Sequence, residues 1–176
     1  MTLGRVADAR ATCERVLAFA PDYRGCQIRV AFAELLRGDP EAARPFLDAI
    51  ARTGDGSALP LVDAVVNALK GHGDRRAAAQ RLAAFSGRSS LDPTSGNIFA
   101  TAETPALLVL LGAPELALEY LERSVDEPEN TATPPEWPMM LPALDPIRCT
   151  PRFKALVERL NTRDPRAAKV CAPGTT

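Results

Sequence analysis

The chain has 176 residues, of which 46% are hydrophobic and 24% charged, so it is long enough to form one domain with a sizeable core. Its 21 basic and 22 acidic residues leave a net charge of −1, which argues against a nucleic-acid-binding protein that depends on a strong basic field. The single histidine, His72, excludes a multi-histidine metal site, and no apolar run approaches the roughly 18 residues that a membrane-spanning helix needs. We therefore expect no cofactor and no metal, and neither nucleic acid nor membrane as a partner.

Helix-forming residues dominate the chain, and its apolar residues recur at the three- and four-residue spacing of an α-helix. In chain order, helices are predicted at residues 6–20, 24–36, 40–52, 59–70, 75–85, 105–111, 115–125 and 151–160. Proline and glycine mark the helix ends, because proline is favoured at the first helical position and glycine just after the last. Asp39-Pro40 and Thr150-Pro151 are two such starts. Loops are predicted at residues 53–57, 86–96 and 126–138.

Small residues recur with a period close to that of a helix pair. Gly4, Gly38, Gly73 and Gly112 are spaced by 34, 35 and 39 residues. After each of the last three glycines, an alanine follows at the fifth position and a leucine four residues later. These alanines and leucines are Ala43 and Leu47, Ala78 and Leu82, and Ala117 and Leu121. The spacing predicts an internal repeat of helical units.

This pattern resembles the tetratricopeptide repeat over roughly residues 4–125. That family has a small residue after its first helix, an alanine early in its second helix and a closing proline, here Pro21. The resemblance implies an all-α fold, a right-handed stack of antiparallel helix pairs (an α-solenoid) with about three to four units. Most aromatic positions of the family's first helix are aliphatic or polar in this chain. The first unit lacks its first helix, so we expect either a chain cut from a larger protein or a degenerate first repeat.

The segment Leu141–Phe153 is similar to the closing segment of bacterial repeat proteins, many of which are C-terminal regions of winged-helix transcriptional regulators or adenylate-cyclase-like signalling proteins. Independently of that resemblance, Pro146 and Pro151 fix a turn, and Phe153 anchors the last helix. A repeat stack needs such a cap over its open apolar end. We therefore expect a helical-repeat domain at residues 1–125, with a proline-rich connector and capping helix at residues 126–176 packed on the same domain.

The expected function is a non-catalytic protein–protein interaction scaffold, a region of a larger bacterial regulatory or signalling protein. A stack of this kind binds a protein or peptide segment on its concave surface. On the repeat frame, the groove is predicted to be lined by Ile28, Phe32, Leu35, Asp63, Asn67 and Lys70. Two other interpretations remain open: Phe32 and Leu35 belong to the core, or the groove closes over the chain's own loop at residues 86–96 or its connector.

Three other functions are compatible with a helical chain of this composition to different degrees. A structural homo-oligomerisation module would bury the same surface against a second copy. An enzyme is disfavoured, because no cluster of catalytic residues is visible, and a nucleic-acid-binding repeat is disfavoured by the charge. Two charged clusters are interpreted as solvated helix faces: the acids Glu115, Glu119 and Glu122, and the bases Lys70, Arg75, Arg76 and Arg81.

The four cysteines, Cys13, Cys26, Cys149 and Cys171, are widely spaced and include no CxxC motif. One interpretation is that they are small buried residues in a reducing compartment. The alternative is an oxidising compartment with disulfides, of which Cys13–Cys26 and Cys149–Cys171 are the first pairs to consider. The N-terminal sequence lacks the apolar segment of a signal peptide. The expected compartment is therefore the cytoplasm, or the periplasm if the chain is a fragment of a membrane-anchored regulator.

Overall fold

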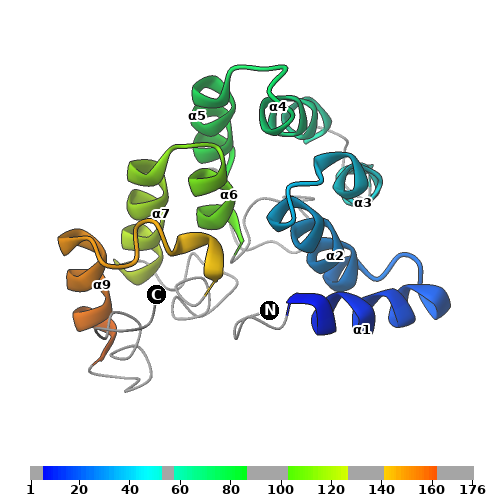
Figure 1. Ribbon diagram of the computed structural model, residues 1–176, viewed down its shortest axis with the longest axis horizontal. Helices are drawn as coiled ribbons and strands as arrows, with labels where there is room; N and C mark the ends of the chain where they lie inside the picture. Colours follow the sequence, from blue (N-terminus) through cyan, green and yellow to red (C-terminus); the bar gives the residue numbers. More distant parts are fainter. Residues whose placement is uncertain (1–5, 53–57, 87–102, 127–140, 162–176) are drawn as a thin grey trace.

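The computed structural model describes residues 6–52, 58–86, 103–126 and 141–161, and within these ranges it contains helices and turns but no β-strand (Figure 1). The α-helices are α1 (Val6–Phe19), α2 (Arg24–Leu36), α3 (Pro40–Arg52), α4 (Leu59–Leu69), α5 (Arg75–Ser86), α6 (Thr104–Leu110), α7 (Pro114–Asp126) and α9 (Pro151–Asn161). A short 3₁₀-helix, η2 (Pro142–Leu144), precedes α9. The predicted all-α class is thus confirmed for the described residues.

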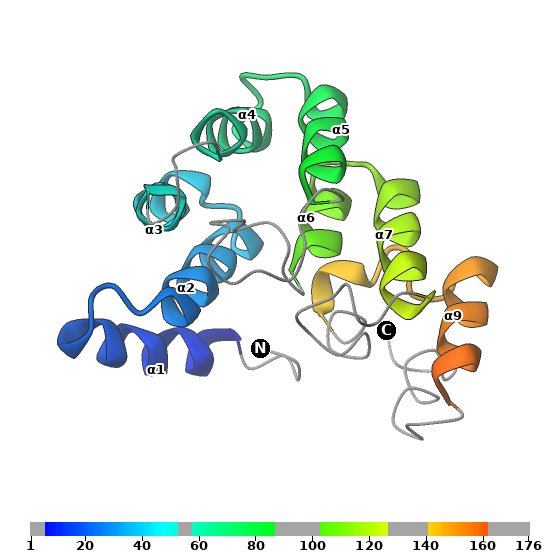
Figure 2. The same cartoon turned by 180° about the vertical axis from the view of Figure 1, so that it is seen from behind.

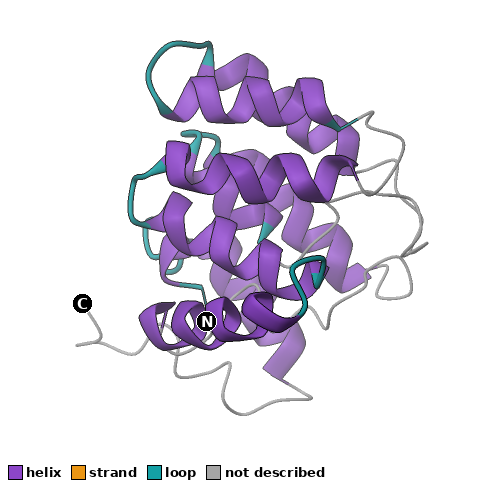
Figure 3. Ribbon diagram, turned by 90° about the vertical axis from the view of Figure 1, so that its right-hand side faces the viewer, coloured by secondary structure: helices purple, strands orange, loops and turns teal. Residues whose placement is uncertain are grey.

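Seen down the shortest axis of the molecule, the helices follow an arch from α1 at one end to α9 at the other (Figures 1 and 2). In these views α2 and α6 lie on the inner side of the arch, and α3, α5 and α7 lie on its outer side. From α1 to α7, each helix contacts the next along the chain, and α9 packs on α7. Viewed from the side, the helices lie one above another (Figure 3). Short turns join α1 to α2, α2 to α3, α4 to α5 and α6 to α7. The chain therefore builds its core mainly from neighbours in sequence.

The helices α2, α4 and α6 end in the same way. After α2, Gly38 has a φ of 79°, and its N–H donates to the Leu35 carbonyl at 3.1 Å. The N–H of Asp39 then donates to the Glu34 carbonyl at 3.0 Å, which completes a Schellman motif. Gly71 (φ 79°) and Gly112 (φ 78°) make the equivalent bonds, from Gly71 to Ala68, His72 to Asn67, Gly112 to Val109 and Ala113 to Leu108. Only glycine adopts this left-handed conformation without strain.

The helices that follow two of these turns begin with an aspartate cap. Oδ1 of Asp39 accepts a hydrogen bond from the Ala42 N–H at 3.0 Å, and Oδ1 of Asp74 accepts one from the Ala77 N–H at 3.0 Å. Each carboxylate satisfies a backbone donor that the first helical turn leaves without a partner. Together, the glycine and the aspartate fix where one helix stops and the next starts.

The glycine of the second turn differs from the one that the sequence spacing suggests. The positive φ is at Gly71, whereas the expected five-residue distance to Ala78 is counted from Gly73. This turn is two residues longer than the turn after α2. Gly73 has a separate role, because a Cβ at this position would lie 3.1 Å from the backbone nitrogen of Ala68. A side chain at this position would require the backbone at the end of α4 to move by a few tenths of an ångström.

Alanine in place of Gly38, Gly71 or Gly112 is expected to lower the free energy of unfolding by about 1 kcal/mol each. A Cβ at any of the three positions would meet no atom within 4 Å, so the cost is backbone strain alone. Urea denaturation of the three variants measures it. The matched control is Gly25→Ala, because Gly25 lies within α2 and the change is expected to stabilise the protein by about 0.5 kcal/mol. Equal effects at Gly25 and the three turn glycines would contradict the assignment.

The main core is one apolar cluster that includes residues of α2 through α7, η2 and α9. Buried alanines and leucines occupy matching places in three helices: Ala43 and Leu47 in α3, Ala78 and Leu82 in α5, and Ala117 and Leu121 in α7. The last helix shares this core, since Phe153 and Leu156 belong to the same cluster. A second, smaller cluster joins α1 to α2 and consists of Cys13, Cys26 and Val30, with Val16, Leu17 and Phe46 packed against it.

Candidate functional site

Two of the six residues predicted to line a groove are core residues. Phe32 and Leu35 are 2% and 3% exposed and belong to the main apolar cluster, so they offer no surface to a partner. Ile28 is partly buried against the same cluster. The groove prediction is therefore corrected at Phe32 and Leu35, and the core interpretation accounts for both. The physical reason is that fully burying a phenylalanine or leucine is worth about 1.5–3 kcal/mol relative to leaving it in water.

Of the other three predicted residues, Asp63 and Asn67 lie on α4 and Lys70 is its C-cap residue, and all three share one side of that helix. Asp63, Asn67 and Lys70 are four and three residues apart, a spacing that places side chains in a row. Asp63 accepts a hydrogen bond from Arg44 of α3, and Lys70 donates a hydrogen bond to Glu41, which also lies in α3. This row therefore borders α3.

We call the surface formed by Glu41, Arg44, Asp63, Asn67 and Lys70 the α3–α4 seam. Its four charged groups form two ion pairs, so the seam has no net charge. Arg44 also contacts Asp48 of α3 at 3.5 Å, and the charge of Asp48 is balanced by Arg52 at 3.7 Å. The hydrogen bond from Lys70 lowers the pKa of the Glu41 carboxyl, and the hydrogen bond to Asp63 raises the pKa of Arg44. Asn67 is exposed between the two ion pairs. Its side-chain amide makes no hydrogen bond within the part of the chain that the structure describes, so it can both donate to and accept from a bound group.

The acidic row on α7 is not simply a solvated face, because two of its three carboxylates hold α9. Nε and Nη2 of Arg152 donate to the two oxygens of Glu122, both at 2.6 Å, and Nη1 donates to Glu115 at 2.8 Å. Glu119 is exposed, as the solvated-face interpretation predicted. One turn further along α7, Asp126 accepts a hydrogen bond from Arg159 of α9. These pairs connect α9 to α7, and the hydrogen bond from Arg152 lowers the pKa of Glu122.

Arg152→Ala is expected to lower the free energy of unfolding at pH 7 by at most about 1 kcal/mol, since the pair remains open to water. Because the folded-state pKa of Glu122 lies below its ordinary value of 4.5, the pair stabilises the protein above that pH, and its contribution disappears as the pH falls through the folded pKa. The difference between variant and parent should thus shrink toward acid pH in denaturation curves. Lys154→Ala, an exposed change on the same helix, is the control and should show no such pH dependence. A constant difference from pH 7 down to pH 3 would contradict the assignment.

The basic cluster does not converge on one site. Nε of Arg75 donates to the Ala68 carbonyl at 3.3 Å, at the end of α4, while Arg76 and Arg81 are exposed on α5. Lys70 is paired with α3 as described above. His72 is exposed in the turn between α4 and α5, where its N–H closes the Schellman motif. These contacts stabilise helix ends and leave the remaining charges in solvent.

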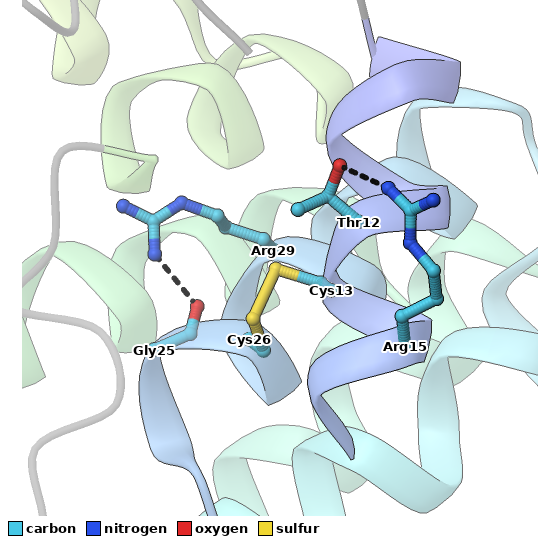
Figure 4. The surroundings of a disulfide bond; sticks show 6 residues. All are labelled: Thr12, Cys13, Arg15, Gly25, Cys26 and Arg29. Carbon is cyan, nitrogen blue, oxygen red and sulfur yellow. Dashed lines mark hydrogen bonds between the residues drawn. A yellow bond between two sulfur atoms is a disulfide. The ribbon is translucent and has the colours of Figure 1, made fainter. Parts of the chain in front are cut away.

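A disulfide joins Cys13 of α1 to Cys26 of α2 (Figure 4). This is one of the two pairs considered from the sequence. For the other pair, Cys149 is an exposed free thiol and Cys171 lies outside the described residues. An ion pair accompanies the disulfide, because Arg10 of α1 contacts the buried carboxylate of Glu34 at 2.8 Å. The two helices are therefore linked by one covalent bond and one charge pair.

Two aromatic residues missed from the sequence flank the turn between α1 and α2. Phe19 is 91% exposed and Tyr23 is 54% exposed, and they are the large hydrophobic side chains with the greatest exposure among the described residues. Phe19 could have been noticed, because at 3.6 residues per turn it falls away from the side of the helix that carries Cys13, Val16 and Leu17. Large apolar side chains that remain in water are candidates for contact with another protein.

Neither a metal site nor a membrane-spanning helix is found in the described ranges. No group of three or more His, Cys, Asp or Glu side chains there is placed to hold a metal ion. None of the helices described is both long and apolar enough to cross a bilayer. The chain matches no protein-family model, and neither a curated protein nor a solved structure matches it significantly.

Proposed function

We propose that the chain is a non-catalytic helical-repeat scaffold, a right-handed stack of antiparallel helix pairs similar to tetratricopeptide repeats, that binds a protein or peptide segment. The observation that carries the proposal is the threefold use of one turn, at Gly38, Gly71 and Gly112, each followed by a helix with a buried alanine and leucine at matching places. Repetition of one local design along the chain is typical of repeat proteins, whose common use is recognition of other proteins.

The surface we propose for the partner is the α3–α4 seam. Its charges already neutralise one another, so a bound segment need not bring a charge of its own. The side-chain amide of Asn67 carries both N–H donors and an acceptor oxygen, so it can pair with the N–H and the carbonyl of a peptide group in an extended segment. The partner expected from this chemistry is an extended, largely uncharged polypeptide segment.

Affinity capture from a lysate of the source organism tests the proposal, with quantitative mass spectrometry of the captured proteins. Asn67→Ala should abolish capture of at least one partner that the parent retains. Gln80→Ala, which changes an exposed amide on α5 outside the seam, should leave that capture unchanged. Identical sets of captured proteins for the parent and both variants would refute a role for the seam.

Self-association is a second candidate function, favoured by the exposed Phe19 and Tyr23 at the α1–α2 end of the arch. Burial of both rings against a second copy would remove a large apolar area from water. Sedimentation velocity over a range of concentrations should then reveal a dimer that Phe19→Ser/Tyr23→Ser converts to a monomer. A parent that stays monomeric at the highest concentration would exclude this function.

We also propose the kind of larger protein and the compartment to which the chain belongs. The similarity of the Leu141–Phe153 segment to the ends of bacterial repeat proteins supports a region of a regulatory or signalling protein. The disulfide between Cys13 and Cys26 favours an oxidising compartment such as the periplasm over the cytoplasm.

A further inference from the structure

We propose that the Cys13–Cys26 disulfide is a redox switch that controls the docking of α1 on α2. In the oxidised state the bond holds α1 against α2, and in the reduced state α1 leaves α2 while the rest of the fold persists. The proposal concerns the regulation of this end of the arch and does not depend on which partner the seam binds.

The first argument is that α1 lies outside the main core. The buried residues of that core come from α2 and later elements, and α1 contributes none of those in the described part of the chain. Within the described ranges, the helix against which α1 packs extensively is α2. Its apolar anchors are Cys13, Val16 and Leu17, and of these only Cys13 is buried. Detachment of α1 therefore leaves the main cluster intact.

The second argument is that the buried charge at this interface does not need α1. Glu34 accepts from Arg10 of α1 at 2.8 Å, but it also pairs with Arg37 at 3.1 Å, just after its own helix. When α1 departs, the Glu34 carboxylate keeps one cation and gains water. An uncompensated buried charge, which would oppose opening, does not arise.

The third argument concerns the side chains beside the disulfide. Arg15 donates to Thr12 within α1 at 3.4 Å, and Arg29 donates to the Gly25 carbonyl within α2 at 2.9 Å (Figure 4). Neither bond crosses between the helices. Within the described residues, α1 is held against α2 by the disulfide, the small apolar cluster and the Arg10–Glu34 ion pair, among other contacts. Of these three links, the disulfide is the one that a change of redox state removes.

The chemistry is a thiol–disulfide exchange. A dithiol such as dithiothreitol transfers two electrons and two protons to the Cys13–Cys26 bond, which yields two thiols, and the dithiol becomes a cyclic disulfide. Each cysteine is 5% exposed, so attack on the sulfur requires a transient opening of α1. The bond links two residues that are 13 positions apart in the sequence. Reduction removes this constraint, so the segment between the cysteines gains conformational entropy when α1 opens. The reduced state uncovers Val30 of α2 and Phe46 of α3.

Hydrogen exchange followed by mass spectrometry tests the switch on the full chain. The Cys149→Ser/Cys171→Ser variant serves as the parent, because its remaining cysteines are Cys13 and Cys26. Dithiothreitol should accelerate exchange in residues 6–19 on the order of 100-fold, with less than about a threefold change in α4–α7. Reoxidation should restore the slow exchange. A further Cys13→Ala/Cys26→Ala change should reproduce the reduced pattern without reductant.

Three results would overturn the proposal. Unchanged exchange in α1 on reduction would show that α1 docks without the bond. Accelerated exchange throughout α4–α7 would show that the bond is needed for the whole fold and controls no local docking step. Free thiols at Cys13 and Cys26 in protein equilibrated with oxidised glutathione, detected by alkylation and mass measurement, would show that the bond does not form.

Discussion

Phe153→Ala is expected to lower the free energy of unfolding by about 3–5 kcal/mol. Phe153 lies in α9 with none of its surface exposed, and it shares one apolar cluster with residues that begin as early as α2. Truncation to alanine removes the transfer free energy of the ring and leaves a cavity that the surrounding helices fill only in part. Urea denaturation monitored by circular dichroism measures the loss.

The shape of the same curve tests whether α9 shares one domain with the preceding helices. If the core is continuous, the Phe153→Ala variant unfolds in a single transition at a lower urea concentration. A separate early transition, with the main transition unmoved, would show that α9 unfolds independently and would contradict a shared core. Lys154→Ala is the matched control, because this neighbouring side chain is exposed and its loss should change the stability by less than about 0.5 kcal/mol.

The helix boundaries were predictable because local residues determine them. The helix predicted at residues 40–52 is α3 with the same bounds, and the one predicted at 105–111 is α6, shifted by one residue. Glycine after a helix, and aspartate or threonine before a proline, act within a few residues of their own position. The sequence did not show that Gly71, and not Gly73, is the equivalent of Gly38. Both glycines follow the same helix, and only the structure shows which of them has the positive φ.

The candidate site was less predictable, because it depends on contacts between distant segments. The spacing of Phe32 and Leu35 shows that they share an apolar side of a helix, but it does not show whether other helices cover that side. The partner of Glu122 is Arg152, which is 30 residues away. No periodicity within one helix connects them. Likewise, the spacing of the cysteines left both disulfide formation and free thiols open.

Leu82→Ala is expected to lower the free energy of unfolding by about 2–5 kcal/mol and to reduce the cooperativity of the transition. Leu82 is fully buried in α5, and α5 contacts α4, α6 and α7, so it connects the two sides of the arch. Leu47 in α3 and Leu121 in α7 occupy the matching places nearer the ends. In a stack where each unit contacts its neighbours, loss of a central contact weakens the coupling between the flanking units.

The comparison of Leu47→Ala, Leu82→Ala and Leu121→Ala therefore separates a repeat stack from a single globular core. In a stack, Leu82→Ala should decrease the slope of unfolding against urea concentration, since parts of the protein then unfold at different concentrations. Leu47→Ala and Leu121→Ala should mainly destabilise their own end. Gln80→Ala, an exposed change on the same helix as Leu82, should leave both midpoint and slope as in the parent. If the three variants lost the same free energy of unfolding and kept the slope of the parent, the helices would form one cooperative core. The helical units between the repeated turns would then not unfold separately.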